Sequence, residues 1–274
     1  MLVSQEAKKL LGERWRNLPD YLRQGNQMVG QYWTQCGFTM GPSYCSFGCS
    51  HCYLPTNANR QPMLSLAQMK SQIDANRKAL GPGGNLQITG GDVVDAYTRT
   101  NRREELVEII AYCVSQDLVP MVMTHGQSLM RDPDYLVELV REGGLRKISC
   151  HIDITQAGRE GYPVKQLVSE GQLNPVRDRL VELVLDTRSR TGKALSAAQT
   201  VTVTSKNIDS LHEVLDWLFS KPQNMDVTRT LGIQTEAQVG RTLSLANWVT
   251  PEQVWERICD ATDTQLPREG LLYG

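Results

Sequence analysis

Short apolar runs alternate with longer amphipathic stretches along most of the chain. The apolar runs predict strands at Tyr32–Met40, Leu86–Thr89, Val119–Thr124, Lys147–Ile154, Leu195–Thr204 and Val227–Glu236. The stretches between them predict helices at Leu64–Leu80, Arg103–Gln116, Asp134–Glu142, Pro175–Thr191 and Asn207–Ser220. Each of these helices is long enough to cross back over a sheet, and parallel strands need such crossovers. The pattern therefore predicts an α/β fold with a parallel sheet.

Three of the predicted strands have a polar face opposite an apolar face. The polar positions are Ser149, His151 and Asp153 in the fourth strand, Thr200, Thr202 and Thr204 in the fifth, and Thr228, Thr230, Gln234 and Glu236 in the sixth. Strands of a sheet covered on both sides are usually apolar on both faces. A polar face therefore indicates a sheet curled around a wet interior, as in a barrel or partial barrel. The catalytic and binding residues of such folds lie at the carboxyl ends of the strands.

Size and charge exclude several classes of protein. The chain has 274 residues and a formal net charge of -1, with 29 Lys and Arg against 30 Asp and Glu. This balance gives no electrostatic reason to expect a nucleic-acid or acidic-membrane partner. There is no long apolar run, and the first residues carry charges where a signal peptide would be apolar. We therefore expect a soluble, cytoplasmic protein that acts on a small molecule or a peptide.

The seven cysteines are unevenly spaced. Cys45, Cys49 and Cys52 fall within eight residues, directly after the first predicted strand. In a reducing compartment, crowded thiols indicate a metal site rather than disulfides. Three thiolates on a short loop can hold three irons of a cubane cluster and leave the fourth iron open to a ligand. The alternative is a zinc site completed by His51 or Cys36.

In these motifs the sequence resembles the radical SAM enzymes, over roughly residues 32–241. That family has a Cys-x₃-Cys-x₂-Cys loop after the first strand of a partial (βα)₆ TIM-like barrel. Four further segments match: Thr89-Gly90-Gly91-Asp92 at the end of the second strand, Thr124-His125-Gly126 at the end of the third, Val203-Thr204-Ser205-Lys206-Asn207 at the end of the fifth, and Val239-Gly240-Arg241 after the sixth. Asp92 replaces a glutamate usual in the family, and His51 stands where many members have an aromatic residue.

The resemblance implies a [4Fe–4S] cluster on Cys45, Cys49 and Cys52, with S-adenosylmethionine (SAM) on the open iron. Reductive cleavage of SAM would give a 5′-deoxyadenosyl radical that abstracts hydrogen from a substrate. The candidate cofactor-binding residues are His51, Thr89, Gly90, Gly91, Asp92, His151, Asp153 and Thr202. The candidate substrate-binding residues are Gln234, Glu236 and Arg159. For His151 with Asp153, a hydrogen-bonded pair without a ligand is the alternative, and for Arg159 it is a solvated charge.

The predicted organisation is an N-terminal helical extension at 1–31, the barrel at 32–241 and a C-terminal helical tail at 242–274. Only Cys259 follows Cys150, so we expect no domain with auxiliary clusters. The resemblance implies flavodoxin or ferredoxin as electron donor, and a peptide or small molecule as substrate. Activation of a glycyl-radical enzyme, or a non-catalytic zinc or iron–sulfur module, are the alternative functions.

Overall fold

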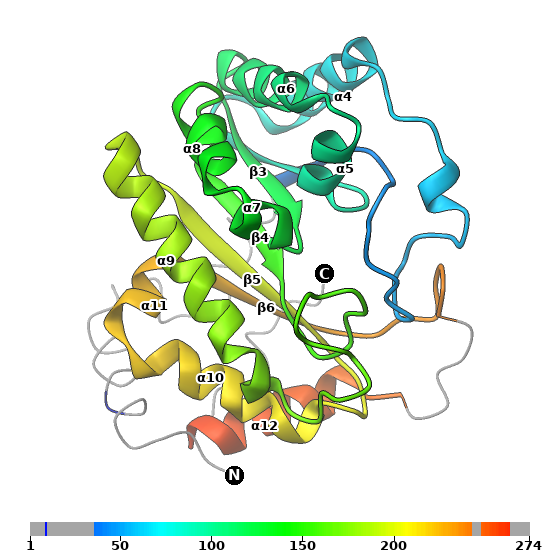
Figure 1. The fold of residues 1–274 in the computed structure, drawn as a ribbon, viewed down its shortest axis with the longest axis vertical. Helices are drawn as coiled ribbons and strands as arrows, with labels where there is room; N and C mark the ends of the chain where they lie inside the picture. The colour runs from blue at the N-terminus through cyan, green and yellow to red at the C-terminus, as the bar shows by residue number, and fades with distance from the viewer. Residues whose placement is uncertain (1–8, 10–35, 243–247, 264–274) are drawn as a thin grey trace.

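The fold is built on one parallel sheet of six strands whose spatial order equals their order in the chain. This computed structural model describes residues 9, 36–242 and 248–263. The strands run in the order β1-β2-β3-β4-β5-β6 (Figure 1). Their bounds are Cys36–Met40 for β1, Gly84–Thr89 for β2, Leu118–Thr124 for β3, Lys147–His151 for β4, Ser196–Val203 for β5 and Thr228–Thr235 for β6.

Helices connect successive strands and follow one another around the outer side of the sheet (Figure 1). The α-helices are α4 (Leu66–Leu80), α5 (Val93–Arg99), α6 (Arg103–Ser115), α7 (Gln127–Arg131), α8 (Pro133–Arg141), α9 (Asn174–Thr191), α10 (Leu211–Ser220), α11 (Pro222–Val227) and α12 (Pro251–Thr262). Short 3-10 helices are η1 (Ala58–Arg60), η2 (Glu170–Leu173) and η3 (Ile208–Ser210). This strand–helix winding confirms the predicted partial TIM-like barrel.

The hydrophobic core lies between the sheet and these helices. Leu86, Ile88, Val122 and Ile148 point outward from three strands, and each is fully buried. The inner face is different, because Phe38 is 57% exposed there and the polar positions of β4, β5 and β6 share that side. The predicted division between a polar interior and an apolar outer face is therefore confirmed.

Two strand bounds differ from the prediction at functionally relevant places. β4 ends at His151, so Asp153 lies in the loop after the strand and not on its inner face. Its carboxylate then accepts backbone N–H groups of the loop and of β5. β6 begins at Thr228, because Val227 ends the short helix α11. A strand prediction from apolar runs extends too far where a turn or a helix end is also apolar.

The short helices were missed for a different reason. α5, α7 and α11 have five to seven residues, too few to display a helical period. Two of them begin at typical start signals of a helix. The Asp92 side chain accepts a hydrogen bond from Asp95 N at the start of α5, and Pro222 occupies the first turn of α11. The predicted helix at 207–220 is the 3-10 turn η3 followed by α10.

A buried ion pair anchors the loops that follow β4 and β5. Arg177 of α9 and Glu170 of η2 have fully buried side chains, with 2.6 Å between Nη2 and Oε2. Arg177 also donates to the carbonyl of Ile152 at 3.0 Å, and Glu170 accepts from Ile154 N at 3.0 Å and from Asn207 Nδ2 at 2.7 Å. One pair thus ties α9 to the carboxyl ends of two strands.

The predicted N-terminal helical extension at 1–31 lies outside the described residues, apart from Lys9. In the predicted C-terminal tail, the described part contains α12, which begins at a capping box formed by Thr250 and Gln253. None of the helices in the described part of the chain combines the length and the apolar character that crossing a bilayer requires.

Candidate active site

The three-cysteine loop leaves β1 at the carboxyl end of the sheet and is held by hydrogen bonds from three sides. Asn59 bonds both the N–H and the carbonyl of Cys45, at 3.1 and 2.9 Å. Gly48 N donates to the carbonyl of Ala157 at 2.7 Å. Arg241 N donates to the carbonyl of Cys52 at 2.8 Å, so the segment after β6 runs beside the loop (Figure 1).

Gly90 and Gly91 let the end of β2 approach the start of this loop. A Cβ on Gly91 would lie 2.0 Å from the carbonyl oxygen of Tyr44, and one on Gly90 would lie 2.6 Å from that of Pro42. Gly91 N donates to Pro42 O at 2.8 Å, and the Tyr53 hydroxyl donates to Gly90 O. Both glycines are therefore needed for backbone to pack on backbone, whatever else binds there.

Phe47, between the first two cysteines, lies between two side chains from other strand ends. The imidazole of His125, after β3, stacks on its ring with centroids 3.9 Å apart. The guanidinium of Arg159, after β4, lies 5.4 Å from the ring centroid. Arg159 is only 6% exposed and donates to the carbonyl of His151 at 3.1 Å, so the alternative of a solvated charge is wrong.

Asp92, which caps the N-terminus of α5, and Asp95 within α5 hold His125. Asp92 Oδ2 accepts from the Thr124 hydroxyl at 2.8 Å and from His125 N at 2.5 Å. His125 Nδ1 accepts from Gln127 N at 3.1 Å, which leaves the proton on Nε2, 3.2 Å from Asp92 Oδ2. Burial raises the pKa of Asp95, but hydrogen bonds from His125 and Ser46 outweigh it, and the pKa falls to about 2. The Asp92 carboxylate is thus engaged inside the fold.

Four of the predicted residues form one polar network at the carboxyl ends of β4, β5 and β6. His151 Nε2 lies 2.9 Å from both Asp153 Oδ2 and the Thr202 hydroxyl, and Gln234 Nε2 donates to that hydroxyl at 3.3 Å. Burial raises the pKa of Asp153, but the adjacent His151 and hydrogen bonds from Thr155 and Thr202 N lower it to about 2. Asp153 is therefore a carboxylate that fixes the orientation of a partly exposed imidazole.

A second histidine–carboxylate pair joins the cysteine loop to β6. His51 Nδ1 lies 2.5 Å from Glu236 Oε2, off the direction of a hydrogen bond, and neither atom has a hydrogen-bonding partner within the described residues. The Glu236 side chain is 6% exposed and that of His51 is 31% exposed. The pair therefore places a buried carboxylate and a partly exposed imidazole beside the cysteines, as candidate contacts for a ligand.

The donor set fits an iron–sulfur cluster. Cys45, Cys49 and Cys52 are free, partly exposed thiols. Burial raises the pKa of Cys45 to about 12 and that of Cys49 to about 11, so both keep their protons until a metal displaces them. In the described part of the chain no three His, Cys, Asp or Glu side chains converge as a single metal ion requires. A cubane instead places each thiolate on a different iron, so its ligands need not converge.

The fold thus brings the predicted site residues to the carboxyl edge of the sheet in two groups. One surrounds the loop: the three cysteines, His51, Gly90, Gly91, Asp92, Arg159 and Glu236. The other is the network of His151, Asp153, Thr202 and Gln234. Thr89 lies beside the first group: its hydroxyl donates to the sulfur of Met123 at 3.2 Å, and its side chain hydrogen-bonds Tyr53, which follows Cys52. Sequence reasoning missed the contacts of Phe47 and Asp95, because their partners are far away in the chain.

Comparison with solved structures identifies the fold. The structure of the anaerobic sulfatase-maturating enzyme anSMEcpe with bound AdoMet, a radical SAM enzyme, matches with a TM-score of 0.55 and 11% identity. The match covers 83% of this chain and 59% of that one, so this chain spans about three fifths of its length. The same enzyme with AdoMet and the Cp18Cys peptide gives a TM-score of 0.47 and 10% identity, covering 80% and 56%. No family model and no curated protein sequence matches the chain.

Proposed function

We propose that this chain is a radical SAM enzyme that cleaves S-adenosylmethionine reductively at a [4Fe–4S] cluster. The observation that carries the proposal is the position of three free thiols on one loop, at the carboxyl edge of a six-stranded parallel partial barrel. The match to a radical SAM enzyme supports the fold on which the loop lies. The spacing of the cysteines supports the chemistry.

Cys45, Cys49 and Cys52 would hold the cluster. When bound, a reduced cluster supplies the electron that splits SAM into methionine and a 5′-deoxyadenosyl radical, which abstracts hydrogen from the substrate. Phe47 of the loop is buried against the post-β4 segment, which would shield that side of the loop from water and stray hydrogen donors. The raised thiol pKa values imply that cluster assembly releases protons.

The surrounding residues would bind and orient SAM. Because the Asp92 carboxylate accepts hydrogen bonds from the end of β3, contacts to SAM at the Gly90-Gly91 segment would come from the backbone. The other candidate contacts to SAM are His51, Thr89, His151, Asp153 and Thr202. Among them, His51 and His151 expose part of an aromatic ring, on which an adenine can stack.

Gln234 and Glu236 on and after β6 would face the substrate, which we propose is a peptide or a small metabolite. Arg159 is engaged with backbone carbonyls and with Phe47, so its contribution would be to position the loop. A flavodoxin or ferredoxin in the cytoplasm would supply the electron. The balanced charge of the chain supports a substrate that is neither nucleic acid nor membrane.

Anaerobic reconstitution with iron and sulfide tests the proposal. The wild-type chain should take up about four irons, as a cubane cluster requires. Cys49→Ala should lose the cluster, whereas Cys113→Ala should retain it, because Cys113 is buried in α6 away from the loop. Retention of zinc in place of iron, with no cluster absorption, would contradict the proposal and favour a structural metal module.

A further inference from the structure

Two buried aspartates are tied to the immediate neighbours of Cys45, the first cysteine of the loop. Asp92, which caps α5, donates its backbone N–H to the carbonyl of Tyr44 at 2.8 Å. Asp95, within α5, accepts the N–H of Ser46 on Oδ2 at 2.8 Å. Tyr44 and Ser46 directly precede and follow Cys45. The fold thus brings two acidic side chains, both buried, to one of the three proposed cluster ligands.

Hydrogen bonds stabilise both side chains as carboxylates. Asp92 Oδ1 accepts the N–H of Asp95 at 2.7 Å. Asp92 Oδ2 accepts the Thr124 hydroxyl at 2.8 Å and the N–H of His125 at 2.5 Å. Three donors on one carboxyl group favour its charged form. Burial raises the pKa of Asp95, but hydrogen bonds from His125 and Ser46 bring it to about 2. Each aspartate therefore carries a full negative charge inside the fold.

The basic side chains nearby do not neutralise this pair of charges. Within the described part of the chain, His125 is the only basic residue within 4 Å of either carboxylate. Its Nδ1 accepts the N–H of Gln127 at 3.1 Å, so the imidazole is neutral. Arg99 lies over the ring of Tyr44, but it is exposed, and water screens its charge. Arg159 is buried, but it donates to backbone carbonyls and to a side-chain amide.

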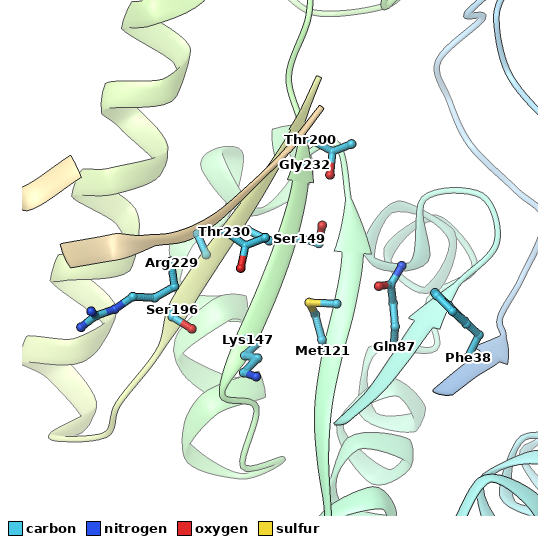
Figure 2. Close-up of a pocket in the computed structure, with 12 residues that line it drawn as sticks. Phe38, Gln87, Met121, Lys147, Ser149, Ser196, Thr200, Arg229, Thr230 and Gly232 are labelled. Atoms are coloured by element: carbon cyan, nitrogen blue, oxygen red, sulfur yellow. The ribbon is translucent and has the colours of Figure 1, made fainter. Parts of the chain in front are cut away.

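Negative charge is not a general property of the inner face. A cavity of about 540 Å³ lies there, toward the amino ends of the strands. Lys147 and Arg229 are among its lining residues, and none of the described lining residues is Asp or Glu (Figure 2). The described acidic residues that are buried all follow the carboxyl ends of strands: Asp92, Asp95, Asp153, Glu170 and Glu236. Buried negative charge is therefore concentrated at the end that holds the cysteine loop.

The two carboxylates act on the sulfur of Cys45. Burial raises the pKa of Cys45 to about 12, and the charges of Asp92 and Asp95 add to the increase because they repel a thiolate. A hydrogen bond from the N–H of Phe47 to Cys45 Sγ, at 3.4 Å, acts in the opposite direction. The same repulsion opposes the addition of an electron to a cluster on that sulfur. Net charge, hydrogen bonds to sulfur and solvent exposure all set the reduction potential of iron–sulfur clusters.

We propose that Asp92 and Asp95 lower the reduction potential of the cluster, so that its reduced form is a stronger electron donor toward SAM. Both residues act through Cys45 and need no contact with SAM. One electron from an external donor enters the cluster and leaves it when the sulfonium is cleaved. The carboxylates change the energy of that electron and take no part in making or breaking bonds. The inference rests on the proposed function, whereas the negative potential at Cys45 exists without a cluster.

Redox potentiometry of the reconstituted chain tests the proposal. Asp95→Asn removes one charge and keeps an oxygen that can accept the N–H of Ser46. Its one-electron reduction should become about tenfold more favourable, a shift of about 59 mV to more positive potential. Asp178→Asn removes the same charge on α9, where Asp178 accepts from Trp217 Nε1 and pairs with Lys221. This control should keep the wild-type potential. An unchanged potential in Asp95→Asn, or an equal shift in Asp178→Asn, would overturn the proposal.

A second measurement on the metal-free chain covers a variant that does not take up iron. Two methanethiosulfonates, one with a trimethylammonium group and one with a sulfonate group, modify thiols at rates that depend on the local potential. Cys45 should favour the cationic reagent, and Asp95→Asn should lower the ratio of the two rates at least about fivefold. Opening of the loop changes both rates together and leaves their ratio constant. Cys259, a partly exposed thiol on α12, is the internal reference, and its ratio should not change.

A constant ratio at Cys45 in Asp95→Asn would overturn the proposal, because the aspartate would then impose no field on the sulfur. If the wild-type chain assembles no cluster but shows the expected ratio, only the proposed function is refuted.

Discussion

The imidazole of His125 lies parallel to the ring of Phe47, with 3.9 Å between the ring centroids and 8° between the ring planes. One ring belongs to the end of β3 and the other to the loop between Cys45 and Cys49. Phe47 is 3% exposed, and Gly158 packs so closely on its ring that a Cβ there would lie 2.9 Å from Cδ1. The stack therefore links the loop between the first two cysteines to the residue after β3, and it needs no metal to form.

Phe47→Leu should therefore loosen the loop while keeping an apolar residue there. A stacked pair of this kind is worth about 1 kcal/mol beyond burial, so opening of the loop should increase five- to tenfold by rough estimate. Alkylation of Cys45 and Cys49 by iodoacetamide in the metal-free chain, measured by mass spectrometry, should accelerate accordingly. Cys113 serves as the internal control, and Phe47→Tyr should preserve the slow rate. Equal rates in wild type and Phe47→Leu would show that the stack does not hold the loop.

Gly91→Ala should disturb the same loop from the side of β2. The added Cβ would meet Tyr44 O at 2.0 Å, and backbone must move to relieve the clash, at a cost of about 1–3 kcal/mol. Gly48→Ala is the matched control, because a Cβ there has no atom within 4 Å. Thermal unfolding and iron uptake should be impaired in the first variant and near normal in the second. The reverse order would contradict the packing role of Gly91.

Removing one partner of the buried Glu170–Arg177 ion pair should strongly destabilise the folded protein. Arg177→Met leaves an unpaired buried carboxylate and should lower the free energy of unfolding by about 3–5 kcal/mol. Arg177→Met combined with Glu170→Gln should recover part of the loss, since no buried charge remains. Urea denaturation measures both. The double variant should be the more stable of the two, and a less stable double variant would show that the unpaired charge is not the source of the loss.

Asp153 makes stability depend on pH in a defined direction. Its pKa of about 2 in the folded protein lies below the ordinary value of 3.8. The ionised carboxylate therefore stabilises the folded state fully at any pH above that ordinary value. That contribution, about 2 kcal/mol, is lost as the pH falls through the folded pKa. The stability difference between wild type and Asp153→Asn should therefore shrink between neutral pH and pH of about 2. A difference that stays constant over this range would show that the His151 contact does not hold the charge.

Much of the architecture follows from local patterns. The alternation of polar and apolar residues in β4, β5 and β6 predicts that His151, Thr202 and Gln234 share an interior. In the structure, His151 Nε2 and Gln234 Nε2 both lie within 3.3 Å of the Thr202 hydroxyl. Long strands and helices can be predicted from the period of their apolar residues, and the three-cysteine loop from the spacing of its cysteines. These signals lie within a few residues of each other in the chain, which is why a single sequence contains them.

Contacts between distant segments could not be predicted in this way. Phe47 meets His125 and Arg159 only because the loops after β1, β3 and β4 converge at one edge of the sheet. Arg159 looked like an isolated surface charge, and nothing near it in the sequence indicates burial. The apolar residues on both sides of Asp153 predict that it belongs to β4, yet the strand ends at His151. Tertiary packing decides all three positions.

The central claim is that this chain uses a cluster on Cys45, Cys49 and Cys52 to split SAM. The most direct measurement is chromatographic detection of 5′-deoxyadenosine after the reconstituted chain is reduced with dithionite in the presence of SAM. The nucleoside should accumulate with wild-type protein and with Cys113→Ala, and should be absent with Cys49→Ala. Intact SAM in the presence of a fully assembled, reduced cluster would contradict the claim.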